Sequence, residues 1–165
     1  RYVCKRFKGT IPYAKISKRG FSSFEHMKIV VVSGGFDPLH SGHIAYFREA
    51  KELGMYLIVG VNSDEWLMRK KGYVFMPIEE REEIIKSIEY VNGVNRFNDD
   101  DDSSIDLLNK VKYWYPSVEI IFANGGDRNE SNCRELSVSG VKFVYGVGGT
   151  DKKNSSSEIV EKVRA

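Results

Sequence analysis

Short apolar runs alternate along the chain with segments of helical periodicity. The runs are rich in β-branched and aromatic residues and predict strands at residues 28–33, 55–61, 90–97, 118–123 and 141–145. Apolar residues at helical spacing predict helices at residues 43–53, 78–89, 104–114 and 156–163, with a weaker pattern at 132–136. Several strand runs are apolar throughout, which is typical of strands covered on both faces. The pattern predicts an α/β fold, a three-layer sandwich in which right-handed crossovers join a five-stranded parallel sheet.

Composition places the chain among ordinary globular domains. Its 165 residues are 41% hydrophobic and 29% charged, which excludes wholesale disorder and a coiled coil. No apolar run approaches the roughly 18 residues that span a bilayer, so membrane insertion is not expected. The two cysteines, Cys4 and Cys133, are too far apart in sequence to form a disulfide framework or a zinc site, which favours a reducing, cytoplasmic location.

Charge is unevenly distributed along the chain. Residues 1–26 carry seven Lys or Arg and one acid, for a net charge of +6, whereas residues 27–165 have a net charge of −4. Because residues 1–26 show no sustained apolar period, we expect a basic extension outside a catalytic fold that spans residues 27–165. Met27 as the natural start is the favoured interpretation, ahead of an organellar transit peptide and of an electrostatic arm for RNA or a membrane surface. The basic excess lies outside the folded body, so no nucleic-acid partner is expected.

Residues 99–102 are four consecutive aspartates between the third predicted strand and the helix at residues 104–114. A loop with four carboxylates could hold a divalent metal. Acids at the start of a helix also favour the positive end of its dipole and are usually solvated. We prefer this structural interpretation and assign no metal ligands.

The loop after the first predicted strand, SGGFDPLHSGH at residues 33–43, carries the most chemical information. It lies at the carboxyl end of a strand and the start of a helix, where open α/β sheets bind ligands. Gly34 and Gly35 allow a tight turn and the close approach of a ligand. Ser41 is expected to cap the helix, with Gly42 leaving room for a phosphate to reach the helix amides.

Two histidines in this loop are three residues apart, which puts both imidazoles of His40 and His43 on one side of the first helical turn. A lone histidine near a helix start is usually a surface or core residue. A zinc site would need further ligands, and the chain offers only His26 and two remote cysteines. The combination of a strand, two glycines, Asp37 and the spaced histidines therefore favours a phosphate site.

These residues carry a family resemblance. GGFDPLHSGH resembles the HxGH motif of the nucleotidyltransferase superfamily with the cytidylyltransferase-like fold, and further segments match in order. LIVGVNSDEWLMRKKG is similar to the second strand and lysine-bearing loop, and PIEEREEIIKSIEYVNGV to the helix with an early active-site arginine. FANGGDR resembles the loop that meets the base and ribose, and NSSSEIVEKV the helix start that holds the β and γ phosphates. The resemblance covers nearly all of residues 27–165, implies a Rossmann-like fold and is greatest to heptose 1-phosphate adenylyltransferase domains and glycerol 3-phosphate cytidylyltransferases.

The resemblance implies a catalytic set and a nucleotide-binding set of residues. The two histidines would donate to phosphate oxygens, and a lysine on a mobile loop would neutralise substrate charge. The catalytic residues would be His40, His43, Lys70, Lys71 and Arg81. The nucleotide-binding residues would be Gly34, Gly35, Phe36, Asp37, Gly42, Asn124, Gly126, Asp127, Ser155, Ser156 and Ser157. Mg²⁺ is the implied cofactor, and Asp37 would orient the acceptor phosphate through a lysine or this metal.

Several of these residues also have structural interpretations. RKKG is equally a solvated basic turn, and which of Lys70 and Lys71 faces the site is left open. Arg81 stands among four glutamates, where a surface ion pair is about as common as an active-site role. One of the three serines would suffice as an N-cap, and Asp127 could simply cap a turn.

We therefore predict a cytoplasmic nucleotidyltransferase that transfers CMP or AMP from CTP or ATP to a sugar or polyol phosphate, of the glycerol 3-phosphate or heptose 1-phosphate type, and releases pyrophosphate. A homodimer is expected because many relatives are dimers. The alternatives are an adenylyltransferase for a cofactor precursor, of the FMN or phosphopantetheine type, and a catalytically silent nucleotide-binding module. GTDKKNSSS has lysines where glycerol 3-phosphate cytidylyltransferases usually have an arginine, which leaves CTP against ATP open.

Overall fold

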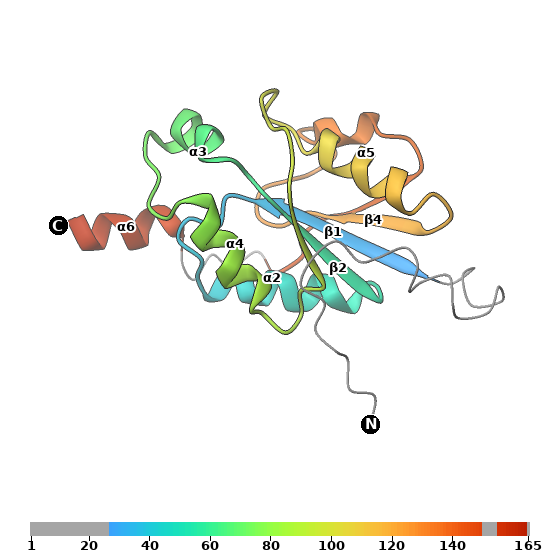
Figure 1. Ribbon diagram of the computed structural model, residues 1–165, viewed down its shortest axis with the longest axis horizontal. Coiled ribbons are helices and arrows are strands. Elements are labelled where there is room, and N and C mark those ends of the chain that lie inside the picture. The colour runs from blue at the N-terminus through green and yellow to red at the C-terminus, as the bar shows by residue number, and fades with distance from the viewer. Residues whose placement is uncertain (1–26, 150–154, 165) are drawn as a thin grey trace.

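The computed structural model describes residues 27–149 and 155–164, and in these residues five parallel strands form one sheet at the centre of the protein. The strands are β1 (Lys28–Gly34), β2 (Tyr56–Val61), β3 (Gly93–Arg96), β4 (Glu119–Ala123) and β5 (Val141–Val144), in the spatial order β3-β2-β1-β4-β5 (Figure 1). In the register of the sheet, Val30 of β1 lies between Leu57 of β2 and Ile121 of β4. The winding of the chain reverses between β1 and β4, which is where sheets of this kind bind ligands.

Helices cover both faces of the sheet. α2 (Ser41–Glu52) and α4 (Ile78–Lys86) pack on one face, and α5 (Ile105–Trp114) and the 3₁₀ helix η2 (Arg134–Ser137) lie on the other (Figure 1). α3 (Asp64–Lys71) and α6 (Ser156–Arg164) lie toward the carboxyl ends of the strands. These layers confirm the predicted Rossmann-like three-layer sandwich with its parallel sheet.

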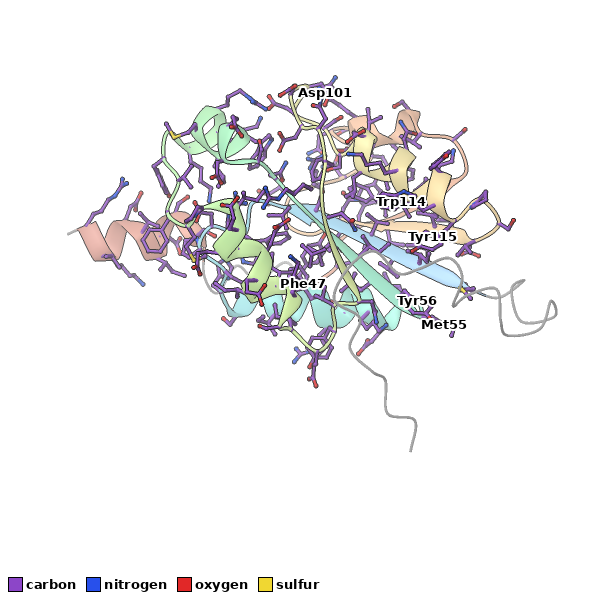
Figure 2. The ribbon with its side chains drawn as sticks, viewed as in Figure 1. Phe47, Met55, Tyr56, Asp101, Trp114 and Tyr115 are labelled. Atoms are coloured by element: carbon purple, nitrogen blue, oxygen red, sulfur yellow. The ribbon has the colours of Figure 1, made fainter. Side chains whose placement is uncertain are left out.

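The central strand β1 divides the core because its side chains alternate between the two faces. Val30 points to the side of α2 and α4, where Phe47 is fully buried. Val31 points to the side of α5, where Tyr115 closes the end of the helix (Figure 2). Residues 29–32 of β1 are buried on both faces, which explains why these four residues are all apolar.

The predicted elements agree with the structure to within a few residues at most boundaries. All five predicted strands are present, although the third is shorter than its apolar run. The weak pattern at residues 132–136 is the 3₁₀ helix η2. The basic extension predicted for residues 1–26 lies outside the described residues, and the boundary at Met27 stays a prediction.

One helix, α3, was not predicted, and the lysine-bearing segment expected to be a loop is its last turn. Ser63 caps the helix by accepting from the amide of Trp66, and Gly72 ends it in the left-handed conformation with φ 77°. Only Leu67 of this helix is buried. Without a stripe of apolar residues, the segment gives no periodic signal in the sequence.

No helix in the described part of the chain combines the length and the apolar character that crossing a membrane requires.

Candidate active site

A cavity of about 820 Å³ opens at the carboxyl ends of β1, β4 and β5. Its walls are the loop between β1 and α2, the first turns of α2, the loops after β4 and β5, and the start of α6. Among the described residues that line it, Lys71 and Arg128 carry a full charge and none has a carboxylate. The cavity therefore has the polarity of a site for an anion.

His40 and His43 hold each other at the start of α2. Nδ1 of His40 accepts from the amide of Gly42 at 3.1 Å, and the amide of His40 donates to Nδ1 of His43 at 3.2 Å. The two rings stack with their centroids 3.8 Å apart. Because both Nδ1 atoms accept, a neutral ring carries its proton on Nε2 and can donate it to a ligand. The predicted cap by Ser41 is wrong, since His40 is the N-cap.

Burial keeps the two imidazoles neutral. It lowers the pKa of His43 to about 3, with smaller contributions from the neighbouring His40 and Lys71. Burial also lowers the pKa of His40, again with Lys71 acting in the same direction. At neutral pH both rings are therefore uncharged donors that would hold a proton more tightly once a phosphate came near.

Glycines in this loop are sites of close packing. A Cβ at Gly34 would lie 2.9 Å from the ring of Phe36, and a Cβ at Gly42 would lie 2.9 Å from the ring of His40. At Gly35 a Cβ would lie 2.8 Å from Leu67 of α3. All three line the cavity and each lets a neighbouring side chain approach the loop, while their contact with a nucleotide stays a prediction.

Phe36 packs against the second histidine of the loop. Its side chain is 4% exposed and packs edge-on against the ring of His43, with centroids 5.1 Å apart. The other side of the ring meets Phe47 of α2. Phe36 thus fixes the position of His43 and also lines the cavity, and its predicted contact with the nucleotide stays a prediction.

Asp37 is turned away from the cavity. It is 0% exposed, and its carboxylate accepts from the amides of Phe75 and Met76 at 2.7 and 2.6 Å. Both oxygens therefore hold the loop between α3 and α4. Direct contact of Asp37 with a nucleotide does not match this geometry, whereas its predicted action on the acceptor phosphate through a lysine stays a prediction.

Lys71 reaches the cavity and Lys70 does not. Nζ of Lys71 donates to the carbonyl of Asp37 at 3.1 Å, and the side chain lines the cavity. Burial lowers the pKa of Lys71, partly offset by Asp37. Nζ of Lys70 instead lies 3.5 Å from Asp102. Both lysines belong to the last turn of α3, so the predicted mobile loop is wrong.

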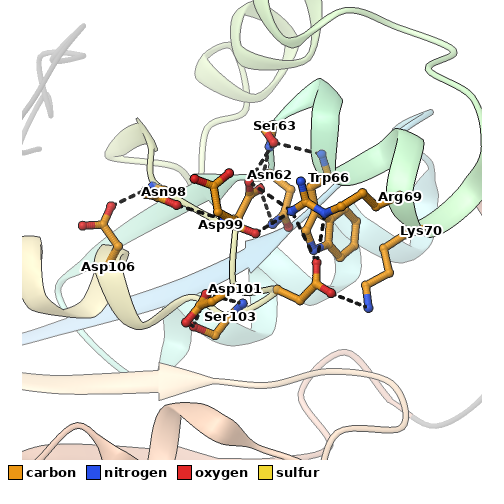
Figure 3. A network of polar contacts seen from close by, with 12 residues as sticks. Asn62, Ser63, Trp66, Arg69, Lys70, Asn98, Asp99, Asp101, Ser103 and Asp106 are labelled. Atoms are coloured by element: carbon orange, nitrogen blue, oxygen red, sulfur yellow. Dashed lines mark hydrogen bonds and ion pairs between the residues drawn. The ribbon is translucent and has the colours of Figure 1, made fainter.

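The aspartate run at residues 99–102 holds α3 in place (Figure 3). The carboxylate of Asp99, which is buried, accepts from Nδ2 of Asn62 at 2.9 Å and from Oγ of Ser63 at 2.7 Å. Arg69 of α3 donates to the carbonyl of Asp99 at 2.7 Å and pairs with Asp102 at 3.3 Å. The run thus anchors the helix that carries Lys71, and Asp99 is buried in these contacts, whereas the sequence suggested solvated acids at the start of a helix.

Arg81 is a buried clamp between three loops. Its side chain is 0% exposed and lies 2.5 Å from the carboxylate of Asp64. Nη1 donates to the carbonyls of Gly35 and Asn62, both at 2.8 Å, and Nε donates to Met76 at 3.0 Å. These bonds take up the guanidinium, so Arg81 is a positioning residue here. Neither predicted role, as a group that touches substrate or as a surface ion pair, matches this geometry.

The loop after β4 forms the far wall of the cavity. Asn124 and Gly126, both predicted to bind the nucleotide, line it, and Gly126 takes a positive φ of 62°. Asp127 is exposed and does not line the cavity, and its carbonyl accepts from the side chain of Asn132. The next residue, Arg128, lines it instead. The predicted contact of Asp127 with the nucleotide does not match this placement.

The three serines at the start of α6 all line the cavity. Oγ of Ser155 accepts from the amide of Glu158, so Ser155 caps the helix. Oγ of Ser156 donates to the carbonyl of Pro38 at 2.9 Å and joins α6 to the histidine loop. Ser157 is exposed at the cavity edge. The N-termini of α2 and α6 therefore face one space, where both favour an anion.

The described residues do not form a resident metal site. They contain no group of three or more His, Cys, Asp or Glu that could hold an ion, and the cavity wall has no carboxylate. Both carboxylate oxygens of Asp37 accept from backbone amides. The Mg²⁺ cofactor implied by the family resemblance stays a prediction.

Several lining residues were not among the predicted site residues, and two of them, Arg128 and Tyr46, have large polar side chains. Arg128 lies in the FANGGDR segment next to Asp127, and its positive charge could have indicated a residue that binds an anion. Tyr46 of α2 lines the cavity and donates to the carbonyl of Ala123 at 2.5 Å. Nothing in its helical spacing separates it from an ordinary core tyrosine.

Comparison with known proteins finds similar chains. Residues 31–162 match the cytidylyltransferase-like family. Bifunctional protein HldE of Hahella chejuensis is 34% identical over 145 residues, which are 83% of this chain and 28% of that protein. FAD synthase of Pyrococcus abyssi is 41% identical over 108 residues, which are 65% of this chain and 68% of that protein. The chain spans about a quarter of the length of the HldE proteins that it matches.

A solved structure has the same arrangement of elements. The lipopolysaccharide core biosynthesis protein of Thermoplasma volcanium superposes with a TM-score of 0.57 at 26% sequence identity. The match covers 76% of this chain and 99% of that chain.

Proposed function

The chain belongs to the cytidylyltransferase-like family, and from that premise we propose that it is a nucleotidyltransferase that joins a nucleoside monophosphate to a phosphorylated acceptor. The observation that carries the proposal is the pair of neutral, stacked imidazoles of His40 and His43 on the cavity wall. A triphosphate bound beside them would also meet the N-termini of α2 and α6 and the ammonium group of Lys71.

In the proposed reaction an oxygen of the acceptor phosphate attacks the α-phosphorus of a nucleoside triphosphate. A new P–O bond forms while the bond to the oxygen that bridges to the β-phosphate breaks, and its electron pair leaves with pyrophosphate. No side chain needs to form a covalent bond, so the protein contributes position and charge stabilisation. Nε2 of His40 and of His43 would donate to the phosphate oxygens, and Lys71 would neutralise charge. The nucleotide would enter as its Mg²⁺ complex.

For the acceptor we propose a sugar or polyol phosphate, of the glycerol 3-phosphate or heptose 1-phosphate type, with CTP or ATP as the donor. Similarity to a protein of lipopolysaccharide core biosynthesis supports a sugar phosphate. The second candidate is an adenylyltransferase for a cofactor precursor of the FMN type, which the 41% identity to FAD synthase supports.

A pyrophosphate-release screen tests the proposal. CTP and ATP are each combined with glycerol 3-phosphate, heptose 1-phosphate, FMN and phosphopantetheine. We expect turnover with at least one pair, and its absence from all pairs would favour the catalytically silent module. The pair that reacts identifies base and acceptor together.

The variant His40→Asn then tests the imidazole itself. Asparagine is a good N-cap and can still accept from the amide of Gly42, but it lacks the Nε2 donor. We expect an unchanged melting temperature and a kcat lower by about 10²- to 10³-fold. Wild-type turnover in His40→Asn would show that the phosphate does not bind at the histidines.

The cytoplasmic location and the homodimer expected from the sequence stay predictions. A chain that starts at Met27 should retain activity, and gel filtration of the full chain measures the oligomeric state.

A further inference from the structure

A fully buried carboxylate lies behind the cavity wall. Glu135, in η2, is 0% exposed. Burying a carboxylate costs several kcal/mol unless the charge is paired and hydrogen-bonded. The structure therefore has to supply partners for both of its oxygens.

The first partner is the start of α5. Oε1 of Glu135 accepts from the amide of Ser104 at 2.8 Å, where the helix dipole also favours a negative charge. Oγ of Ser104 lies 2.7 Å from Oγ of Ser33, which belongs to β1 and lines the cavity. This oxygen of Glu135 is thus held by rigid elements of the fold.

The second partner is the cavity residue Arg128. Nη1 of Arg128 lies 3.1 Å from Oε2 of Glu135, whereas its side chain is still 41% exposed. The thiol of Cys133 also donates to Oε2, at 3.4 Å. One nitrogen of the guanidinium is therefore held by a buried anion, while the residue also lines the cavity.

The position of Arg128 in the cavity indicates which part of a nucleotide it meets. The histidines, Lys71 and the starts of α2 and α6 already supply donors and positive charge for the phosphates. Arg128 lies in the loop after β4. A guanidinium only donates hydrogen bonds, so the group that it faces must present oxygen or nitrogen acceptors. The base and the ribose of a nucleoside present both.

We propose that Arg128 binds the nucleoside part of the nucleoside triphosphate and that Glu135 is a positioning residue that holds Arg128 there. The proposal rests on the nucleotidyltransferase function proposed above. It adds a recognition pair that acts on the nucleotide and not on the acceptor.

Direct binding by calorimetry without acceptor tests the pair, with CTP, ATP and tripolyphosphate as probes. We expect Arg128→Ala to weaken the preferred nucleotide about 10- to 100-fold, as for a lost hydrogen bond to a charged group. Tripolyphosphate has no nucleoside, and its affinity should not change. Arg134→Ala is the matched control, because Arg134 is an exposed arginine of η2 that contacts Asp101 and does not line the cavity.

Glu135→Gln tests the second half of the proposal. Glutamine can still accept from the amide of Ser104, but its amide nitrogen would face another donor on Arg128. We expect the same loss of nucleotide affinity as for Arg128→Ala and no further loss in the double variant, because Glu135 acts through Arg128. If Glu135→Gln fails to fold, Glu135→Asp replaces it in the test. Aspartate keeps the negative charge on a shorter side chain, so we expect an intermediate loss of nucleotide affinity.

Three results would overturn the inference. Equal losses for tripolyphosphate and nucleotide would place Arg128 on the phosphates, and a raised KM for the acceptor alone would place it on the other substrate. Additive losses in the double variant would show that Glu135 does not act through Arg128. A wild-type protein that binds nucleotide through Arg128 but never releases pyrophosphate would refute the proposed function and leave the inference standing.

Discussion

The variant Arg81→Ala distinguishes between two roles for Arg81: a buried residue that joins three loops, and a group that contacts the substrate. The guanidinium of Arg81 bonds three backbone carbonyls and the carboxylate of Asp64, and no part of the side chain is exposed. Removal leaves the carbonyls of Gly35 and Asn62 without this partner in a protein interior. Breaking a buried pair of this kind costs about 3–5 kcal/mol. At roughly 2–4 °C per kcal/mol for a domain of this size, the melting temperature should fall by roughly 10 °C.

Thermal unfolding followed by circular dichroism measures the effect. Arg96→Ala is the matched control, since Arg96 also pairs with acids of α4, Glu79 and Glu82, but is exposed. Such a surface pair contributes less than about 1 kcal/mol. Arg81→Ala should therefore lower the melting temperature far more than Arg96→Ala does.

The refuting result is also specific. If Arg81→Ala unfolded at the wild-type temperature and yet lost turnover in the pyrophosphate assay, Arg81 would act on the substrate. The hydrogen bonds that join it to the three loops would then contribute little to folding, contrary to their burial and geometry.

The remaining predictions concern charge. Lys71→Ala should lower kcat/KM about 10- to 100-fold in the pyrophosphate assay, whereas Lys70→Ala should stay near wild type, because only Lys71 lines the cavity. Burial lowers the pKa of His43 to about 3 in the folded chain, against about 6.5 when unfolded. The unfolded state therefore binds more protons between these values, and stability should fall by up to about 2 kcal/mol from pH 6.5 to 5 in urea titrations, less so in His43→Asn. EDTA should abolish turnover without lowering the melting temperature of the nucleotide-free protein, since its described residues form no metal site.

Each of these predictions has an opposite outcome that would contradict it. Equal losses in Lys70→Ala and Lys71→Ala would mean that α3 does not present a single lysine to the cavity. If the free energy of unfolding fell with pH as steeply in His43→Asn as in the wild type, groups other than His43 would cause the acid sensitivity. A lower melting temperature in EDTA would reveal a structural metal.

The strands and most helices were predictable because their buried faces require apolar residues at regular positions in the sequence. β1 is covered on both faces, so four consecutive positions, residues 29–32, had to be apolar. α3 is held by a cap at Ser63 and by contacts of Arg69 with the aspartate run, and it buries only Leu67. Polar contacts with a segment about 30 residues away leave no period, which is why this helix was missed.

The candidate site was predictable in place but not in detail. The glycines and spaced histidines after β1 pointed to the correct edge of the sheet, and the cavity lies there. The same motif was misread at Asp37, because its partners are backbone amides of residues 75 and 76, which carry no side-chain signal. Arg81 was ambiguous for a similar reason, since its acceptors are mostly carbonyls of distant loops.

The sequence by itself determined the five strands, the helices other than α3 and the family to which the chain belongs, because these follow from local pattern and short motifs. Only the tertiary structure decided which member of each adjacent pair serves the cavity: Lys71 and not Lys70, Arg128 and not Asp127. Adjacent side chains point in different directions, and which direction meets the cavity depends on how distant segments hold the backbone. For Arg128, the buried carboxylate of Glu135 contacts the guanidinium and fixes its direction.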